Sequence, residues 1–226
     1  LSRVTAVGSR RCGGGLAGMP YVSNVVEAGR VADRLAPPAI LFDGSGAAIP
    51  PVAVDRRVLI LGAHQKIDTL RGYFAPYRIR IADVVLVTMC EPPLADASRL
   101  AEIRATVAAI NPRARLVETV FRPQPCYAGS LAGKRVYVAL TAPETMGATL
   151  ARHLEQHHGV EVVGITHALA DRRRRRSDLE HGFEAQPDVV LTEIKAASID
   201  VVAEAAARAG IPVGFLDNIP VALDPG

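Results

Sequence analysis

Short apolar runs recur along the chain and alternate with stretches of helical periodicity. The runs that predict strands span residues 4–8, 39–42, 58–61, 84–88, 116–120, 135–140, 160–165, 189–192 and 213–216. Helical spacing or capping residues predict helices over residues 24–35, 95–110, 143–154 and 196–209. Because most of the strand segments are continuous apolar runs, they are typical of parallel strands buried on both faces. The pattern predicts an α/β fold with a mostly parallel sheet.

A break in this alternation predicts two domains. Residues 122–133 carry two prolines and two glycines, a composition typical of a linker. Strand and helix signals resume after it. We therefore expect one domain over residues 1–125 and a smaller α/β domain over residues 133–226.

The composition narrows the class of protein. Of the 226 residues, 49% are hydrophobic and only 4% are aromatic, so aliphatic side chains must fill a substantial core. The net charge of +3 is too small to indicate a nucleic-acid partner. The apolar runs are too short to cross a membrane. Three isolated cysteines without zinc-ligand spacing favour a reduced, cytoplasmic location.

The most informative segment spans residues 39–51, where an apolar run ends in Asp43 and is followed by Gly44, Ser45 and Gly46. Open α/β sheets bind ligands at the carboxyl ends of their strands, and glycines let a phosphate approach the backbone. Many nucleotide enzymes use a lone carboxylate at such a place to hold Mg²⁺ beside a triphosphate. The alternative is a plain strand-to-turn junction, because Asp and Gly are also common turn residues.

A glycine-rich loop follows the first predicted strand. Gly13, Gly14 and Gly15 can adopt backbone conformations in which their amides converge on an anion. Arg10 and Arg11 precede them and add charge and bidentate donors. The segment favours a phosphate-binding or switch loop, and the alternative is a flexible surface loop.

Polar residues also follow the predicted strands at 58–61 and 84–88. Lys66 comes just past the first of these strands, where it suits a phosphate, and His64 beside it could exchange a proton. The alternative for His64 is a structural or merely exposed histidine. Glu91 follows the second strand, where it either contacts a ligand or is only a loop acid.

In the second predicted domain, polar residues also follow the carboxyl ends of predicted strands. Thr141, the pair Glu193 and Lys195, and Asn218 each follow a predicted strand. Glu193 and Lys195 lie where a strand becomes a helix, and helix N-termini attract anions. Their alternative role is a salt bridge and a helix cap. Five consecutive arginines at residues 172–176 could bind an anion, although a solvated charge run in a loop is favoured.

Several strings of residues resemble those of the cyclic 2,3-diphosphoglycerate synthetase family. They are residues 10–18, 23–25, 44–51, 74–78, 192–197 and 217–218. The resemblance covers nearly the whole chain. It implies that residues 1–125 are the C-terminal part of a P-loop NTPase-like domain, followed by a Rossmann-like unit. The segment around Asp43 also resembles the Glu-Gly-Ala-Gly-Gly segment of dethiobiotin synthetases, which belong to the same broad class.

The resemblance implies an ATP-dependent synthetase (a ligase) that activates a phosphate of 2,3-diphosphoglycerate and closes an intramolecular phosphoanhydride. ATP and Mg²⁺ are its implied cofactors, and a small phosphorylated acid is its substrate. The implied roles are metal binding for Asp43; phosphate or nucleotide binding for Arg10, Arg11, Gly13, Gly14, Gly15, Gly44, Ser45 and Gly46; catalysis for Asp43, Lys66 and Lys195; and substrate binding for Glu193 and Asn218.

One departure from the family concerns the phosphate loop. Family members carry a Gly-x-x-x-x-Gly-Lys-Thr-type loop upstream, and this sequence contains none. We therefore expect a fragment, a split chain or a degenerate homologue. The alternative function is a nucleotide-binding regulatory module, or a kinase-like enzyme acting on another small phosphorylated acid. No nucleic-acid or membrane partner is expected, and a homo-oligomer is left open.

Overall fold

The computed structural model describes residues 4–12, 22–44, 49–194 and 199–223, without the side chains of residues 11, 12, 172, 173, 175 and 176. The strands are β1 Arg11–Cys12, β2 Val22–Ser23, β3 Val58–Gly62, β4 Val84–Thr88, β5 Arg115–Cys126, β6 Arg135–Ala139, β7 Glu161–Thr166, β8 Val189–Glu193 and β9 Val213–Ala222. The helices are α1 Val25–Arg34, α2 Ile67–Arg71, α3 Ala75–Ile81, α4 Ala97–Ile110, the 3-10 turn η2 Glu144–Met146, α5 Gly147–His158, α6 Arg172–Glu184 and α7 Ile199–Arg208.

Most of these strands share one sheet. β1 and β2 form a short ribbon, and within the described residues the other strands form a seven-stranded sheet in the order β3-β4-β5-β9-β8-β6-β7. β6 runs parallel to β7 and β8, β8 runs parallel to β9, and β5 is antiparallel to β9. Helices alternate with these strands along the chain. The predicted α/β fold with a mostly parallel sheet is confirmed.

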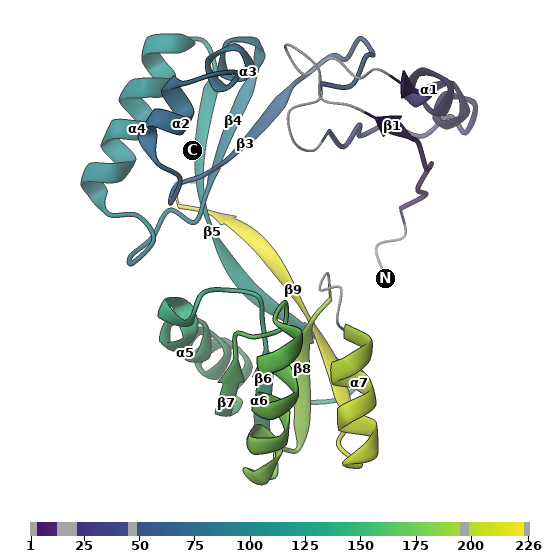
Figure 1. Ribbon diagram of the computed structural model, residues 1–226, viewed down its shortest axis with the longest axis vertical. Coiled ribbons are helices and arrows are strands. Elements are labelled where there is room, and N and C mark those ends of the chain that lie inside the picture. The colour runs from purple at the N-terminus through teal and green to yellow at the C-terminus, as the bar shows by residue number, and fades with distance from the viewer. Residues whose placement is uncertain (1–3, 13–21, 45–48, 195–198, 224–226) are drawn as a thin grey trace. The chain divides into compact units, whose positions relative to one another are not determined.

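The chain divides into two compact units. The first comprises residues 1–61, 65–86 and 101–116, and the second comprises residues 62–64, 87–100 and 117–226. In the first unit, α2 and α4 lie on one side of β3 and β4 (Figure 1). The side chains buried there include Leu59, Leu70, Ile79, Val85, Ile103 and Val107.

The second unit has a core on each face of its sheet. Val138, Leu191 and Leu216 of the sheet pack with Leu150 of α5 on one face. On the other face Val190 packs under α6 and α7 with Leu179 and Val202. Burial of both faces is the usual state of a parallel sheet. None of the helices described is long and apolar enough to span a membrane.

Tyr137 of β6 shows how closely α6 approaches the sheet. Its hydroxyl donates to the Asp178 carbonyl over 2.8 Å. A side-chain Cβ at Gly182 would collide with the Tyr137 ring, so α6 can pack over the ring only with glycine there. Burial, with the nearby negative charge of Asp178, raises the pKa of Tyr137 to about 12. The phenol is therefore a neutral structural donor.

Two of the predicted strands are wrong. Residues 4–8 and 39–42 lie in segments that form neither helix nor strand, and Leu41 is 92% exposed. An apolar run becomes a buried strand only if a neighbouring strand and a covering layer are available to it. Among the described residues no strand pairs with either segment.

The first part of the predicted linker is also wrong, whereas residues 127–133 form neither helix nor strand. Residues 122–126 continue β5, and Arg122 to Cys126 pair with residues 219 to 215 of β9. In an antiparallel pair, alternate residues direct their N–H groups to opposite edges of the strand. Pro123 and Pro125 therefore remove donors from one edge only, and the other edge is free to pair with β9.

Candidate functional site

The Glu193 carboxylate lies at the end of β8. It accepts hydrogen bonds from Thr141, which follows β6, and from Asn218, which lies in β9. Glu193 Oε2 accepts hydrogen bonds from the Thr141 amide (2.8 Å) and the Thr141 hydroxyl (2.6 Å). Glu193 Oε1 accepts one from the side-chain amide of Asn218 (2.7 Å). Thr141 is exposed and Glu193 half-buried, so solvent reaches this place. We call these three residues the Glu193 cluster.

The parallel register explains why the cluster forms. Ala139 of β6 lies opposite Thr192, and Glu193 lies opposite Leu216 of β9. Residues two positions apart on a strand share a face, so Asn218 follows Leu216 on the face that α5 covers. The end of β8 and the middle of β9 therefore bring Glu193 and Asn218 together. The predicted strand at 213–216 is too short, because β9 continues through Asn218 to Ala222.

The cluster offers a fixed hydrogen-bond acceptor. Charge-assisted bonds to both oxygens orient the Glu193 carboxylate, and Thr141 and Asn218 are oriented in return. Lys195 lies outside the described residues, so its catalytic role and its salt bridge with Glu193 stay predictions. Among the described residues, the partners of the Glu193 carboxylate come from β9 and from the segment after β6 rather than from a helix cap.

His167 lies after β7 at the same ends of the strands. Its Nδ1 is 2.7 Å from the Ala142 carbonyl oxygen, which can only accept, so Nδ1 carries a proton. An ideal Cβ on Gly147, at the start of α5, would lie 2.9 Å from His167 Nε2. Glycine at this position therefore leaves room for the imidazole. The sequence places a histidine at this edge but gives no signal for its contact with Gly147.

The arginine run is helical, so the expected loop is wrong. Residues 172–176 begin α6, where the Asp171 side chain accepts a hydrogen bond from the Arg174 amide over 3.3 Å. Asp is a favourable N-cap residue and Arg has a high helix propensity, which together explain the helix. Arg174 is exposed and forms a 3.0 Å ion pair with Glu144. This hydrogen-bonded pair and the nearby Asp178 charge raise the pKa of Arg174.

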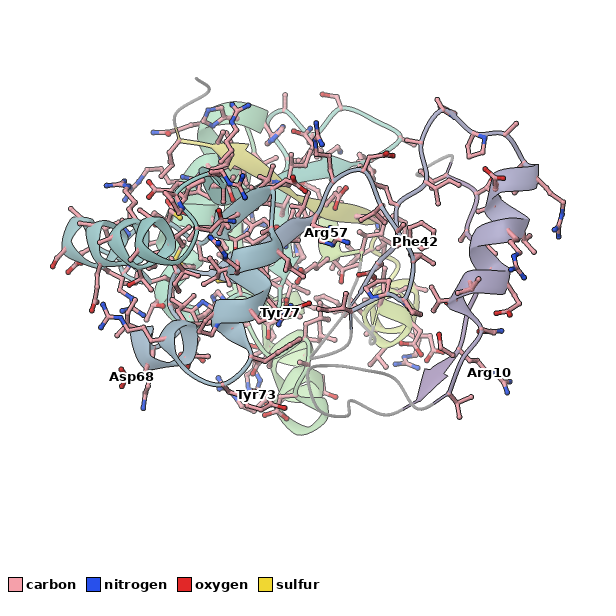
Figure 2. The ribbon with its side chains drawn as sticks, turned by 90° about the horizontal axis from the view of Figure 1, so that it is seen from above. Arg10, Phe42, Arg57, Asp68, Tyr73 and Tyr77 are labelled. Atoms are coloured by element: carbon pink, nitrogen blue, oxygen red, sulfur yellow. The ribbon has the colours of Figure 1, made fainter. Side chains whose placement is uncertain are left out.

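Asp43 is exposed and lies outside any strand, which corrects its expected place at the end of a buried strand. The preceding Phe42 lies beside α1 (Figure 2), with its Cζ 3.3 Å from an ideal Cβ on Gly29. The residue before Asp43 therefore packs against Gly29 of α1. Gly44 is half-buried, and Ser45 and Gly46 lie outside the described residues. The Mg²⁺-binding role of Asp43 stays a prediction.

Arg10 is tied to the start of α1 through its backbone. Its amide donates to Asn24 Oδ1 over 2.6 Å, and the Asn24 amide donates to the Arg10 carbonyl over 3.0 Å. Arg11 pairs with Ser23 across β1 and β2. Gly13, Gly14 and Gly15 lie outside the described residues, so their phosphate-binding role stays a prediction.

Lys66 and His64 follow β3, as the sequence predicts. Lys66 is exposed and occupies the N-cap position of α2. The His64 ring folds back over Gly62, where a Cβ would lie only 2.6 Å from His64 Cε1. Lys66 belongs to the first unit and Glu193 to the second, so the catalytic role of Lys66 and the substrate-binding role of Glu193 stay predictions.

Glu91 is a structural acid rather than a simple loop residue. Its two carboxylate oxygens accept bonds from Arg122 at 2.6 and 2.8 Å, and both side chains are mostly buried. His153 of α5 lies nearby. Partial burial, then the charges of His157 and Arg122, lower the pKa of His153. Sequence reasoning missed this pair because the residues are 31 positions apart and join through tertiary contact.

Comparison with known proteins identifies the family. The model of the cyclic 2,3-diphosphoglycerate synthetase P-loop domain matches residues 1–120, and the model of the C-terminal domain of the same synthetase matches residues 127–219. The chain belongs to the cyclic 2,3-diphosphoglycerate synthetase family. This confirms the resemblance that the sequence strings indicate.

Relatives named cyclic 2,3-diphosphoglycerate synthetase match almost the whole chain. The protein of Rubrobacter xylanophilus is 48% identical over 222 residues, which are 98% of this chain and 49% of the relative. The protein of Methanothermus fervidus is 41% identical over 224 residues, which are 99% of this chain and 48% of the relative. The chain therefore spans about half the length of the curated relatives it matches.

Proposed function

We propose that this chain forms part of an ATP-dependent ligase that makes cyclic 2,3-diphosphoglycerate from 2,3-diphosphoglycerate. The observation that carries the proposal is the similarity of 98–99% of the chain to relatives that bear this synthetase name. In this proposal residues 1–125 complete a P-loop domain, and residues 133–226 form a Rossmann-like domain on the acceptor side. The half of the relatives that lies outside the match supplies the phosphate loop.

The proposed reaction has two steps. An oxygen of one substrate phosphate attacks the γ-phosphorus of ATP, the bond to the β-phosphate oxygen breaks, and ADP leaves. An oxygen of the second substrate phosphate then attacks the activated phosphorus of the first. The intramolecular P–O–P bond closes and inorganic phosphate leaves. Such chemistry depends mainly on positioning and on neutralising phosphate charge.

The described residues supply parts of such a site. The Glu193 carboxylate, fixed by Thr141 and Asn218, positions these two side chains and accepts a hydrogen bond from a protonated substrate oxygen. Lys66 and Lys195 line the acceptor site in the proposal and offset substrate charge. Arg10 and Arg11 bind phosphate together with Gly13, Gly14 and Gly15, and with Gly44, Ser45 and Gly46.

Asp43 can supply only one of the ligands that Mg²⁺ needs. Among the described residues, no group of three or more His, Cys, Asp or Glu side chains is arranged to hold a metal ion. Mg²⁺ at a nucleotide site needs only one or two carboxylates when phosphate oxygens and water supply the rest. One exposed carboxylate at Asp43 meets that requirement. The bound ion would neutralise phosphate charge.

The test uses this chain joined to the phosphate-loop half of the R. xylanophilus relative, which restores the length of the relatives. The fusion is incubated with ATP, Mg²⁺ and 2,3-diphosphoglycerate, and phosphorus NMR follows the products. We expect one cyclic product, one ADP and one phosphate per turnover. ATP consumption with another phosphorylated acid but not with 2,3-diphosphoglycerate would contradict the substrate.

A matched pair of variants tests the Glu193 cluster. Glu193→Gln replaces one acceptor oxygen with a donor that faces other donors, so we expect kcat/KM to fall about 10- to 1,000-fold. Glu144→Gln removes an exposed acid that forms a surface ion pair. It should keep kcat/KM within about twofold of the parent. An equal fall in kcat/KM for both variants would show that the Glu193 cluster is not part of the proposed site.

A further inference from the structure

One face of β3 is apolar and bare. Along this strand Leu59 and Leu61 are buried, whereas Val58 is 60% exposed and Ile60 is 62% exposed. The alternation means that one face is covered and the other is not. On the neighbouring β4 the same alternation leaves Val84 half-buried beside fully buried Val85.

This pattern is unusual for such a strand. Strands that carry apolar residues on both faces belong to sheets with a covering layer on each side. β3 is also an edge strand, and no strand among the described residues pairs with its outer edge. At the start of β3 the Arg57 amide (residue labelled in Figure 2) donates to Asp83 Oδ2 over 2.7 Å, which ties β3 to the segment before β4. Within the part of the chain that the structure describes, β3 is thus an ordered strand with one exposed apolar face.

The comparison with the relatives indicates what covers this face. They are about twice as long as this chain, and most of the match to the P-loop domain model, residues 1–120, lies in the first unit, which holds Val58 to Leu61 of β3. A P-loop domain also needs a strand, a phosphate loop and a helix. The sequence here has no Gly-x-x-x-x-Gly-Lys-Thr-type loop. These missing parts are α/β elements, which bury apolar strand faces.

We infer that the bare face of β3, formed by Val58 and Ile60, and the outer edge of β3 dock the phosphate-loop half of the synthetase. Val84 and Leu86 of β4 extend this surface. The docking half adds to the sheet at β3 and covers its open side, which completes the nucleotide-binding domain. The inference rests on family membership and topology, and not on the reaction proposed above.

Cysteine labelling tests this inference without any substrate. Ile60→Cys is placed in the 226-residue chain and in its fusion to the phosphate-loop half of the R. xylanophilus relative. Val221→Cys is the matched control, because Val221 is also an apolar strand residue, 45% exposed, in the second unit. Exposed Cys126 is the internal reference, and maleimide labelling is measured peptide by peptide by mass spectrometry.

We expect the thiol introduced by Ile60→Cys to react readily in the 226-residue chain and at least about tenfold more slowly in the fusion. The thiol introduced by Val221→Cys should react at similar rates in both proteins. An unchanged rate for the Ile60→Cys thiol in the fusion would overturn the inference. Protection of that thiol in the 226-residue chain that increases with protein concentration would also overturn it, because a second copy would then be the occupant. Val58→Cys should repeat the result of Ile60→Cys.

Discussion

The two units differ in how completely their sheets are covered. In the second unit, α5 lies on one face and α6 and α7 lie on the other, and the central strand β8 is buried from Val189 to Thr192. In the first unit, only one face of β3 is buried, and Leu41 is 92% exposed. Burial of apolar area is the main driving force of folding. The second unit therefore has a complete core of its own, whereas the first has apolar surface left for a partner segment.

The largest expected effect comes from comparing a buried apolar side chain on a strand of the second unit with an exposed one on a strand of the first unit. Leu191 of β8 is fully buried, so Leu191→Ala should reduce the free energy of unfolding by about 2–5 kcal/mol. Ile60→Ala removes a similar side chain from the bare face of β3. It should change the free energy by about 0.5 kcal/mol or less. Urea denaturation of the 226-residue chain, followed by circular dichroism, measures both.

Comparable losses for the two variants would contradict the difference between the units. In the fusion to the phosphate-loop half, Ile60→Ala should become more damaging, because the side chain is then buried. Leu191→Ala should cost the same in both proteins.

The covered side of the first unit gives the next test. Asn111 is buried, and its side-chain amide donates to the carbonyls of Ile79 (3.0 Å) and Ala82 (2.9 Å) at the end of α3. Asn111→Ala leaves these carbonyls without this donor, which should cost about 1–3 kcal/mol. Asn111→Asp keeps the acceptor for the Arg113 amide but loses the donor. It should be no more stable than the alanine variant, as thermal unfolding would show.

The ion pairs of the second unit give a smaller effect. Glu91 and Arg122 form a bidentate pair whose side chains are 16% and 25% exposed, whereas those of Glu144 and Arg174 are more than 60% exposed. Glu91→Gln should cost about 1–2 kcal/mol because it leaves a largely buried guanidinium without its carboxylate. Glu144→Gln should cost less than about 1 kcal/mol. A larger loss for Glu144→Gln in urea denaturation would reverse this ranking.

Sequence reasoning succeeded where a segment contains its own signals. The apolar runs at β3, β4, β6 and β8 are strands, and Asn24 occupies the N-cap position of α1. Glu193 and Asn218, which the sequence places at one edge of the sheet, do meet, because β8 and β9 are neighbouring parallel strands. These features depend on local periodicity and on the geometry of parallel strands, which the sequence carries directly.

The failures arise where the outcome depends on tertiary context. The apolar run before Asp43 is typical of a buried strand. Among the described residues, however, no strand pairs with it and no layer of side chains covers it. Pro123 and Pro125 are typical of a linker. They remove N–H donors from only one edge of β5, and β9 pairs with the other edge. The Glu91–Arg122 pair joins distant segments. Pairing partners and covering layers are not encoded within the segment itself.

The smallest expected effect concerns the histidines of α5. The rings of His153 and His157 stack with centroids 4.3 Å apart, and His158 lies edge-on to His153. Partial burial is the main reason that the pKa values of His153 and His158 are lowered. His157 and Arg122 lower the pKa of His153 further, and Glu91 opposes them. The fold therefore favours the neutral imidazoles of His153 and His158.

These pKa shifts predict the sign of the pH dependence. With folded-state pKa values below the unfolded value near 6.5, the unfolded chain binds protons first as the pH falls. The stability contribution of these groups is complete above about pH 6.5 and is lost as the pH falls through the folded-state pKa values. His153→Gln should therefore flatten the loss of thermal stability between about pH 7.5 and 5.

His181 provides a control of opposite sign. It is exposed, and its hydrogen bond to the Ser177 carbonyl raises its pKa. Its contribution is therefore present below about pH 6.5 and lost as the pH rises through its folded-state pKa. His181→Gln should make the decline of stability at low pH steeper, whereas His153→Gln should make it shallower. Identical pH profiles for the two variants would contradict the opposite pKa shifts of His153 and His181.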